Sequence, residues 1–349
     1  MSLAVRPASL VADRQEIVDL LIRNVACQNH ERLFEWRHLM NPMGEAWVWL
    51  LCDIKGKAVA TASVFPRRML VNGKELLGGH VGVVAVEAAY RSLGPAVQLQ
   101  RTTFALVDSG KIAFCYDCPP DEQRMATFRR LGIPANSEIA RYAYILRSEE
   151  FLEEHIGKGI RSKLLAGPAN LFLNTRRAVG RQPGLQIEEF TGRFSDEFSD
   201  LDRRASSWQV IRGSRSTELL NWRYRECPGW DNPENKVLVA RVRGELVAFV
   251  AFWIECSRKR AYISDLFGLQ LDTVGAALLG AAIESCRRER VFSLHGYCTS
   301  HSELSALFRK AGFRRREKTA TVVAYEKPNG AARTSNHGLN WTFTQMDQM

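Results

Sequence analysis

The sequence predicts an α/β fold, with α+β character, built from two tandem copies of one unit. Three patterns support this prediction, because each occurs twice and in the same order: a Trp-Arg motif followed by proline, two strand-like segments joined by a short turn, and a closing Phe-Arg-x-x-Gly segment. A length of 349 residues is enough for two ordinary domains. The sequence therefore indicates two units of similar architecture.

The first copy begins with a helix expected over residues 13–24, followed by the Trp-Arg motif of residues 33–44. Residues 47–53 and 58–65 are rich in apolar and β-branched side chains, and residues 55–57 between them contain a glycine. This pattern is typical of two antiparallel strands joined by a turn.

The most informative segment of the first copy is the one where a strand passes into a helix. Residues 80–86 are strand-like, residues 97–107 have a helical pattern, and Arg91 to Ala96 between them read Arg-x-x-Gly-x-Ala. A helix N-terminus offers free backbone N–H groups and the positive end of the helix dipole, to which the arginine adds a guanidinium. The segment therefore predicts a cradle for a diphosphate, although Pro95 lacks one N–H donor.

The second copy carries the same three patterns. The motif recurs at residues 219–229, the strand pair at 236–241 and 246–254, and the closing segment at 308–313, which corresponds to 128–133. Its counterpart of the phosphate cradle is 272–277, where Asp272 stands in place of the arginine. A carboxylate there would repel a diphosphate, so only the first copy is expected to hold one.

The order of elements in each copy, together with the spacing of Arg91 to Ala96, resembles the GNAT N-acetyltransferase superfamily over most of residues 1–325. The resemblance implies two GNAT-like units, each a mixed, mostly antiparallel sheet flanked by helices. It also implies that acetyl-CoA or another acyl-CoA is the co-substrate and that no metal takes part. The coenzyme-binding residues that it implies are Val84, Val86, Arg91, Ser92, Leu93, Gly94, Pro95 and Ala96.

The resemblance also divides the chain into domains. An N-terminal GNAT-like domain with the acyl-CoA site is expected at residues 1–148, a linker helix region at 149–184, a C-terminal GNAT-like domain with a degenerate coenzyme motif at 185–326, and a tail at 327–349. Residues 339–344 of the tail have strand-like character, so they are expected to dock back onto the body.

Acyl transfer to an amine needs a group that accepts the amine proton. In many GNAT enzymes this group is a glutamate about eleven residues before the first motif residue, and the same count back from Arg91 reaches His80. An imidazole with an ordinary pKa near 6.5 suits that role, so the rate is expected to fall as the pH drops through this titration. The alternative is that His80 is a strand-start histidine with a structural hydrogen bond.

The usual general-acid tyrosine of the family is a phenylalanine in both copies, Phe128 and Phe308. Tyr116 is therefore the candidate that protonates the leaving thiolate, and Asp117 beside it is a candidate to border the catalytic site. Cys118 closes a lone C-x-x-C, which without a second pair is more often structural than a metal or redox site.

On the acceptor side, Trp253 and Asp265 of the second unit are the candidates for substrate binding, with the carboxylate orienting a cationic amine. Each has an ordinary alternative, as a core aromatic or a strand-end carboxylate. The chain resembles tandem GNAT acyltransferases associated with bacterial polysaccharide and secondary-metabolite biosynthesis, which implies a small amine or amino sugar as acceptor. A Fem-like transferase that uses an aminoacyl or acyl-carrier donor, and a non-catalytic acyl-CoA-binding protein, stay open as alternatives.

The composition of the chain indicates which kinds of partner to expect. The net charge of +10 favours an anionic partner such as coenzyme A or an acyl carrier protein, but the dispersed basic residues form no recognisable nucleic-acid-binding module. No apolar run approaches the roughly 20 residues needed to span a bilayer, and the N-terminus lacks the pattern of a signal peptide. The cysteines are scattered, as in a reduced protein, so a cytoplasmic location is expected, and a homodimer stays open.

Overall fold

The structure is a computed structural model that describes residues 3–25, 29–148, 184–205, 210–228, 235–327, 330 and 340–348. The expected linker helix at 149–184 lies outside the described residues, apart from its last residue. Within the described ranges, no helix is long and apolar enough to cross a membrane.

The first half of the chain contains six strands with helices between them. Its elements are β1 (Ala4–Pro7), α1 (Arg14–Asn24), α2 (His30–Phe34), η1 (Glu35–Leu39), β2 (Trp47–Cys52), β3 (Ala58–Val71), β4 (Lys74–Val86), η2 (Ala88–Tyr90), α3 (Leu93–Asp108), β5 (Phe114–Asp117), α4 (Glu122–Arg130) and β6 (Ala135–Ile145).

The second half follows the same order, with an extra short strand, β8, between its first two helices and a short segment added at its C-terminal end. Its elements are β7 (Leu185–Glu189), α7 (Asp196–Arg204), β8 (Val210–Gly213), α8 (Thr217–Tyr224), β9 (Asn235–Val242), β10 (Glu245–Glu255), β11 (Arg260–Gly268), η3 (Leu271–Gly275), α9 (Ala276–Arg288), β12 (Ser293–Thr299), α10 (Glu303–Lys310), β13 (Arg314–Glu326), β14 (Asn340–Trp341) and η4 (Gln345–Asp347).

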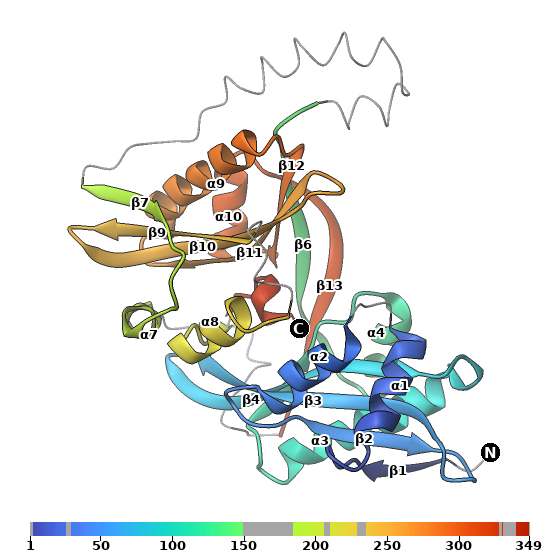
Figure 1. Cartoon of the computed structure of the whole chain (residues 1–349). Helices are drawn as coiled ribbons and strands as arrows, with labels where there is room; N and C mark the ends of the chain where they lie inside the picture. Colours follow the sequence, from blue (N-terminus) through green and yellow to red (C-terminus); the bar gives the residue numbers. More distant parts are fainter. Residues whose placement is uncertain are drawn as a thin grey trace, which may run out of the picture.

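Helices cover both faces of the sheet in each half (Figure 1). In the first half, apolar side chains of α3 and α4 pack on one face of the sheet, and those of α1 and α2 pack on the other. In the second half, α9 and α10 pack on one face of the sheet, as α3 and α4 do in the first half, and α7 and α8 pack on the other. The strand pairs are antiparallel except for β4–β5, β11–β12 and β8–β14. The predicted fold class, a mixed and mostly antiparallel sheet flanked by helices, is therefore confirmed.

The two halves exchange strands at the centre of one continuous sheet. The order there is β5-β13-β6-β12, so β13 of the second half lies between β5 and β6 of the first, and β6 pairs with β12 of the second. These two long strands run side by side between the halves in Figure 1. Each half therefore completes its sheet with a strand from the other.

The repeated Trp-Arg motif forms a second contact between the halves. The indole rings of Trp36 and Trp222 stack with a centroid distance of 4.3 Å. Each indole N–H donates to the backbone carbonyl of the other tryptophan, at 2.9 and 3.0 Å. The reciprocal bonds show that the two copies of the motif pack on each other with local two-fold character.

The C-terminal segment docks at the junction of the two halves, where Trp341 and Phe343 pack against β3 and β5 of the first half. β14 pairs with β8, and the side chains of Trp341 and Phe343 are buried. Thr344 forms a β-bridge with Cys298 of β12, and its hydroxyl donates to the Asp265 carboxylate of β11 at 2.9 Å. The segment thus lies where β11 and β12 move apart, since their pairing ends at Ile263 and Gly296.

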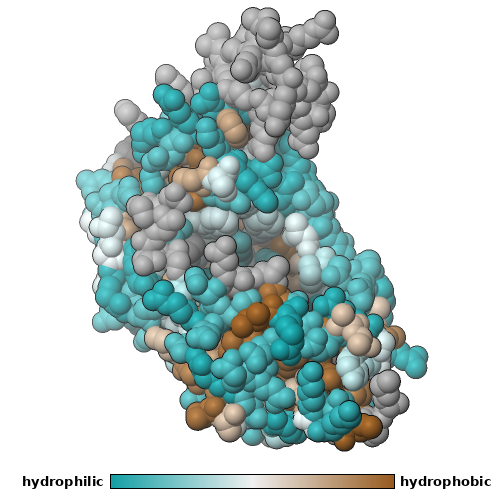
Figure 2. All heavy atoms as spheres, turned by 45° about the vertical axis from the view of Figure 1, so that its right-hand side comes forward, coloured by the Kyte–Doolittle hydropathy of each residue, from teal (hydrophilic) through white to brown (hydrophobic). Residues whose placement is uncertain are grey.

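The exposed apolar side chains are concentrated in the first half. In the face shown in Figure 2, most of the surface is hydrophilic and the brown patches lie mainly over the lower part, which is the first half. Among the described residues, the large exposed hydrophobic side chains are Val11, Ile22, Met40, Ile54, Leu77 and Leu93.

The strand exchange predicts that the first half does not fold alone. In a fragment of residues 1–148, β5 and β6 would lack β13, and Trp36 would lose its stacking partner. We expect no cooperative unfolding transition and no acyl transfer, measured by circular dichroism and thiol release. Co-expression with residues 149–349 should restore both, whereas a folded fragment that works at the full-length rate would contradict the prediction.

Candidate acyl-CoA and acyl-transfer site

The site begins where β4 and β5 separate. These parallel strands pair only from Gly78–Phe114 to His80–Tyr116, and β4 then continues to Val86 without this neighbour. Val83 has a φ of 50°, which is rare for a β-branched residue, and the β3–β4 register shifts beside it. Such strain is found most often at functional sites. Beyond His80, the β5-facing edge of β4 is therefore available to a ligand.

A cavity of about 370 Å³ lies beside this part of β4. Its lining residues come from α1, β4, the turn before α3, α3 itself and the start of α4: Asn24, Val84, Ala85, Val86, Arg91, Ser92, Ala96, Gln100, Asp121, Gln123, Arg124, Thr127 and Phe128. Of the residues predicted to bind the coenzyme, Val84, Val86, Arg91, Ser92 and Ala96 lie in this lining, whereas Leu93, Gly94 and Pro95 do not.

Arg91 and the start of α3 supply positive charge at the cavity. The Arg91 guanidinium donates to the Val86 carbonyl at 3.0 Å and to the Asn24 side-chain oxygen at 3.1 Å, which holds it at the rim. Ser92 precedes α3 in an extended conformation and makes no capping hydrogen bond. The first N–H groups of this helix of 16 residues are therefore left for a ligand such as a phosphate.

His80 and Tyr116 lie on the opposite face of the sheet from α3. His80 is 3% exposed, its ring centroid is 5.0 Å from that of Tyr116, and its Nδ1 has no hydrogen-bond partner among the described residues. A Cβ placed on Gly82 would lie 3.2 Å from the imidazole, so the ring covers the bare backbone just beyond the last β4–β5 pair. This places the orphaned nitrogen next to the point where the strands separate.

The protonation states of both residues follow from their burial. Burial, together with the positive charges of Arg67, Arg124 and Arg37, lowers the pKa of His80 to about 3, so the imidazole is neutral near pH 7. Burial also raises the pKa of Tyr116, whose hydroxyl donates to the Asp347 backbone carbonyl at 3.2 Å. His80 thus offers a lone pair and Tyr116 a proton.

The structure places Asp117 on the other face, away from His80. Its carboxylate accepts hydrogen bonds from the Arg124 guanidinium at 2.9 Å and from the Cys118 backbone N–H at 2.6 Å, and burial raises its pKa. Because Arg124 lines the cavity, Asp117 fixes a cationic wall of the cavity.

The acceptor residues expected from the second half are not brought to His80 by any contact among the described residues. Asp265 is fully buried, and both its carboxylate oxygens accept from Arg215, at 3.0 and 3.1 Å. Trp253 stacks on Tyr262 with a centroid distance of 4.6 Å. Asp265 therefore forms part of a buried ionic cluster, and Trp253 part of an aromatic ladder on the sheet.

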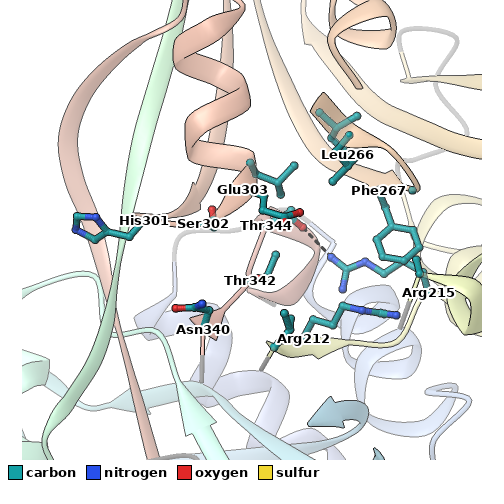
Figure 3. A pocket seen from close by; sticks show the side chains of 15 residues that line it. Arg212, Arg215, Leu266, Phe267, His301, Ser302, Glu303, Asn340, Thr342 and Thr344 are labelled. Carbon is teal, nitrogen blue, oxygen red and sulfur yellow. Dashed lines mark hydrogen bonds between the residues drawn. The ribbon is translucent and has the colours of Figure 1, made fainter. Parts of the chain in front are cut away.

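A smaller cavity of about 150 Å³ marks the corresponding place in the second half (Figure 3). It lies beside Leu266–Gly268 at the end of β11 and the start of α10. The chain's own Asn340, Thr342 and Thr344 form part of its wall, and a hydrogen bond joins Arg215 to Thr344. The C-terminal segment thus occupies the space between the strands that is open in the first half.

Several buried polar residues at the site are not indicated by any sequence pattern. Arg67, Arg215 and Asp347 are buried at the junction, and Asp347 accepts from Arg215 through both oxygens at 2.8 Å. The imidazole of His38 is held between the Phe34 carbonyl and the Ser63 hydroxyl, at 3.2 and 3.0 Å. No local pattern identifies these residues, because their partners lie far away in the chain.

Comparisons with known proteins agree with this geometry. Residues 5–133 match the family model of the acetyltransferase (GNAT) domain. No curated protein matches the sequence. Together with the fold and the cavity, the match to the family model indicates that the protein is an acyltransferase. The first half of the chain is thus similar to GNAT acetyltransferase domains, and the match covers less than half of the chain.

Solved structures share the fold across both halves. A probable N-acyltransferase from Enterococcus faecalis has a TM-score of 0.64 and 17% identity, with 93% of this chain and 73% of that chain covered. A GCN5-related N-acetyltransferase from Anabaena variabilis has a TM-score of 0.65 and 12% identity, with 93% of this chain and 72% of that chain covered. Saccharomyces cerevisiae N-myristoyltransferase with bound myristoyl-CoA and inhibitors has a TM-score of 0.60 and 13% identity. The match covers 100% of this chain and 86% of that chain.

Proposed function

We propose that the protein transfers an acyl group from coenzyme A, bound in the first half, to the amine of a small molecule or amino sugar by direct attack. The observation that carries this proposal is the separation of β4 and β5 directly after His80 and Tyr116, with a cavity beside it that ends at Arg91 and the start of α3. One end of this arrangement suits a diphosphate, and the other presents a proton acceptor and a proton donor.

In the proposed complex, Arg91 and the α3 N-terminus hold the diphosphate. The pantetheine arm runs along Val84 to Val86 and pairs with the free backbone edge of β4. The thioester then lies between β4 and β5, where a backbone N–H near the Val83 bulge stabilises the oxyanion. Arg124, fixed by Asp117, adds positive charge to the cavity wall.

The reaction begins with a neutral amine that approaches from the face of His80 and Tyr116. Its nitrogen attacks the thioester carbonyl carbon, and a tetrahedral intermediate forms. His80 Nδ1 accepts the proton that the nitrogen loses, the C–S bond breaks, and Tyr116 donates a proton to the leaving thiolate. The products are an amide and free coenzyme A.

We assign a short acyl group, such as acetyl, to this site. The rings of Phe65, His80 and Tyr116 lie one after another behind the separation, with centroid distances of 6.5 and 5.0 Å. Phe65 and Tyr116 are fully buried. This dense packing favours an acyl chain that ends close to the thioester carbon.

The second half lacks the features that the proposal requires in the first. Asp272 stands at the position of Arg91, and the C-terminal segment lies between β11 and β12. We therefore assign one working acyl-CoA site to each chain and a structural part to the second unit. The domain division at residues 148 and 184 remains part of this proposal, with β6 and β13 exchanged between the units.

The low pKa of His80 changes the pH dependence expected from an ordinary imidazole. With a pKa of about 3, His80 stays neutral from pH 5 to 8, so its contribution to the rate should not change over this range. We expect the ratio of kcat for wild type to kcat for His80→Ala to be constant from pH 5 to 8, whatever the acceptor amine itself does. A ratio that falls below pH 6.5 would show that the imidazole titrates in its ordinary range.

A further inference from the structure

Arg67 of β3 is a buried cation that makes no direct ion pair, although the Asp347 carboxylate is close enough to interact with its charge. The residue is 1% exposed, and its Nε and Nη1 have no hydrogen-bond partner among the described residues. Its Nη2 donates to the Met346 backbone carbonyl at 3.3 Å. No ion pair joins Arg67 to a carboxylate in the part of the chain that the structure describes. Burying a charge without such a partner is costly, so the position calls for an explanation.

The neighbouring buried arginines are paired. Arg212 forms an ion pair with Asp202, and Arg215 forms ion pairs with Asp265 and Asp347. The Asp347 carboxylate accepts hydrogen bonds from Arg215 and from the Thr344 backbone and hydroxyl, and it makes none with Arg67. The three guanidiniums thus face three carboxylates, but Arg67, unlike the other two, donates no hydrogen bond to any of them.

Arg67 lies next to the proposed point of acyl transfer. On the antiparallel β3–β4 pair, Phe65 is opposite His80 and Arg67 is opposite Gly78, so Arg67 and His80 are diagonal neighbours on one face. The proximity is also electrostatic, because the charge of Arg67 acts on both His80 and Tyr116. The orphaned donors of Arg67 and the orphaned Nδ1 of His80 therefore belong to one small region.

Further positive charge surrounds this region. The guanidinium carbons of Arg37 and Arg223 each lie 5.7 Å from the Trp36 ring centroid, at the junction of the two halves. The Arg223 Nε is buried and has no hydrogen-bond partner in the described part of the chain. An anionic group would be attracted to this junction, and a cationic group would be repelled.

We propose that Arg67 binds a carboxylate carried by one of the two substrates. Either the acceptor amine or the acyl group of the donor is then acidic. This inference rests on the proposed function, because it takes the region around His80 as the place of transfer. The carboxylate belongs either to the acceptor, which is then amino-acid-like or an acidic amino sugar, or to the far end of a dicarboxylic acyl chain. Both sources present the same group to the guanidinium.

The test compares matched substrates with and without the carboxylate. One arm uses acetyl-CoA with amino acids and with the amines that result from their decarboxylation. The other arm uses succinyl-CoA and butyryl-CoA with one neutral amine. In one of the two arms, we expect kcat/KM for the carboxylate-bearing substrate to exceed that of its partner by roughly tenfold or more, and Arg67→Met to remove this preference.

A stability measurement separates binding from a structural role. Because Arg67 lacks an ion-pair partner, Arg67→Met should leave the Tm unchanged or raise it by about 2 °C or more, while the preference is lost. Arg212→Met, the matched control, should lower the Tm, since it removes the guanidinium that neutralises the buried Asp202 carboxylate. A lower Tm in Arg67→Met, similar to that of Arg212→Met, would overturn the inference.

The kinetic outcomes are equally decisive. Arg67→Lys keeps the charge and should retain part of the preference. Acylation of neutral amines without any preference for a carboxylate in either arm, or a preference that Arg67→Met leaves intact, would overturn the inference and leave the proposed function standing. If no combination of acyl-CoA and amine led to release of coenzyme A, this result would overturn both the inference and the proposed function.

Discussion

Replacing Arg91 with glutamate is expected to abolish the binding of acetyl-CoA. The arginine is held at the rim of the cavity by Val86 and Asn24, where its charge and the start of α3 meet the diphosphate of the proposed complex. The substitution removes a charge-assisted contact and adds a repulsive carboxylate. We expect Kd to rise by roughly 100-fold or more, beyond the range of a calorimetric titration.

The control for this variant lies in the second half. Asp272→Asn changes the charge at the corresponding position of the repeat, where no coenzyme is expected, so the affinity should stay within about twofold. Thermal unfolding of both variants should match that of the wild type, since Arg91 makes only exposed contacts. Unaltered binding by Arg91→Glu in a folded protein would refute the assigned phosphate site.

Removing the imidazole of His80 is expected to reduce turnover and to spare coenzyme binding. If His80 Nδ1 takes the amine proton, His80→Ala should lower kcat by roughly two to four orders of magnitude, the usual range for the loss of a general base. The acetyl-CoA affinity should change by no more than a few-fold, because His80 lies on the opposite face from the cavity-lining helix α3. Steady-state kinetics and calorimetry on the same preparation measure both values.

Two further variants sharpen this test. Phe65→Leu alters the packing around His80 without removing a polar group, so it should affect the rate far less. Tyr116→Phe removes the proposed proton donor and should lower kcat separately. Full activity of His80→Ala would exclude the imidazole from the mechanism. Tight acyl-CoA binding by the wild type without thioester cleavage would instead favour a non-catalytic acyl-CoA-binding protein.

The repeat and the fold class could be predicted because their signals are local. A turn such as residues 55–57, a strand that passes into a helix at Arg91, and the glycines after the closing helices are all visible within a few residues. The extent of β3 and β4 was less visible, since β3 continues to Val71 and β4 begins at Lys74. Between residues 66 and 79, a proline, two arginines and three glycines interrupt the apolar pattern.

The strand exchange could not be predicted from the sequence. Pairing β13 with β5 joins Val323 to Asp117, and nothing in either strand specifies a partner in its own half or in the other. The reciprocal Trp36–Trp222 contact was visible as a repeat, but the repeat did not indicate that its two copies pack on each other. Long-range pairing depends on the summed packing of the whole sheet.

Some features of the candidate site could be predicted from the sequence, and others could not. The position of Arg91, Ser92 and Ala96 beside a cavity could be predicted because a helix start has a recognisable sequence, whereas phosphate binding there stays a prediction. The neutral state of His80 could not, because it depends on burial and on three arginines distant in the chain. Asp265 was assigned to substrate binding from its strand position alone, whereas its ion pair with Arg215 exists only once β8, β11 and the C-terminal segment meet.

The central claim is that only the first half of the chain binds acyl-CoA. Calorimetric titration of the full-length protein with coenzyme A tests this claim most directly, because it counts sites without any knowledge of the acceptor. We predict one coenzyme A per chain, since the second half has Asp272 at the phosphate position and its own C-terminal segment between β11 and β12. Two equivalent sites per chain, or a single site that survives Arg91→Glu, would contradict it.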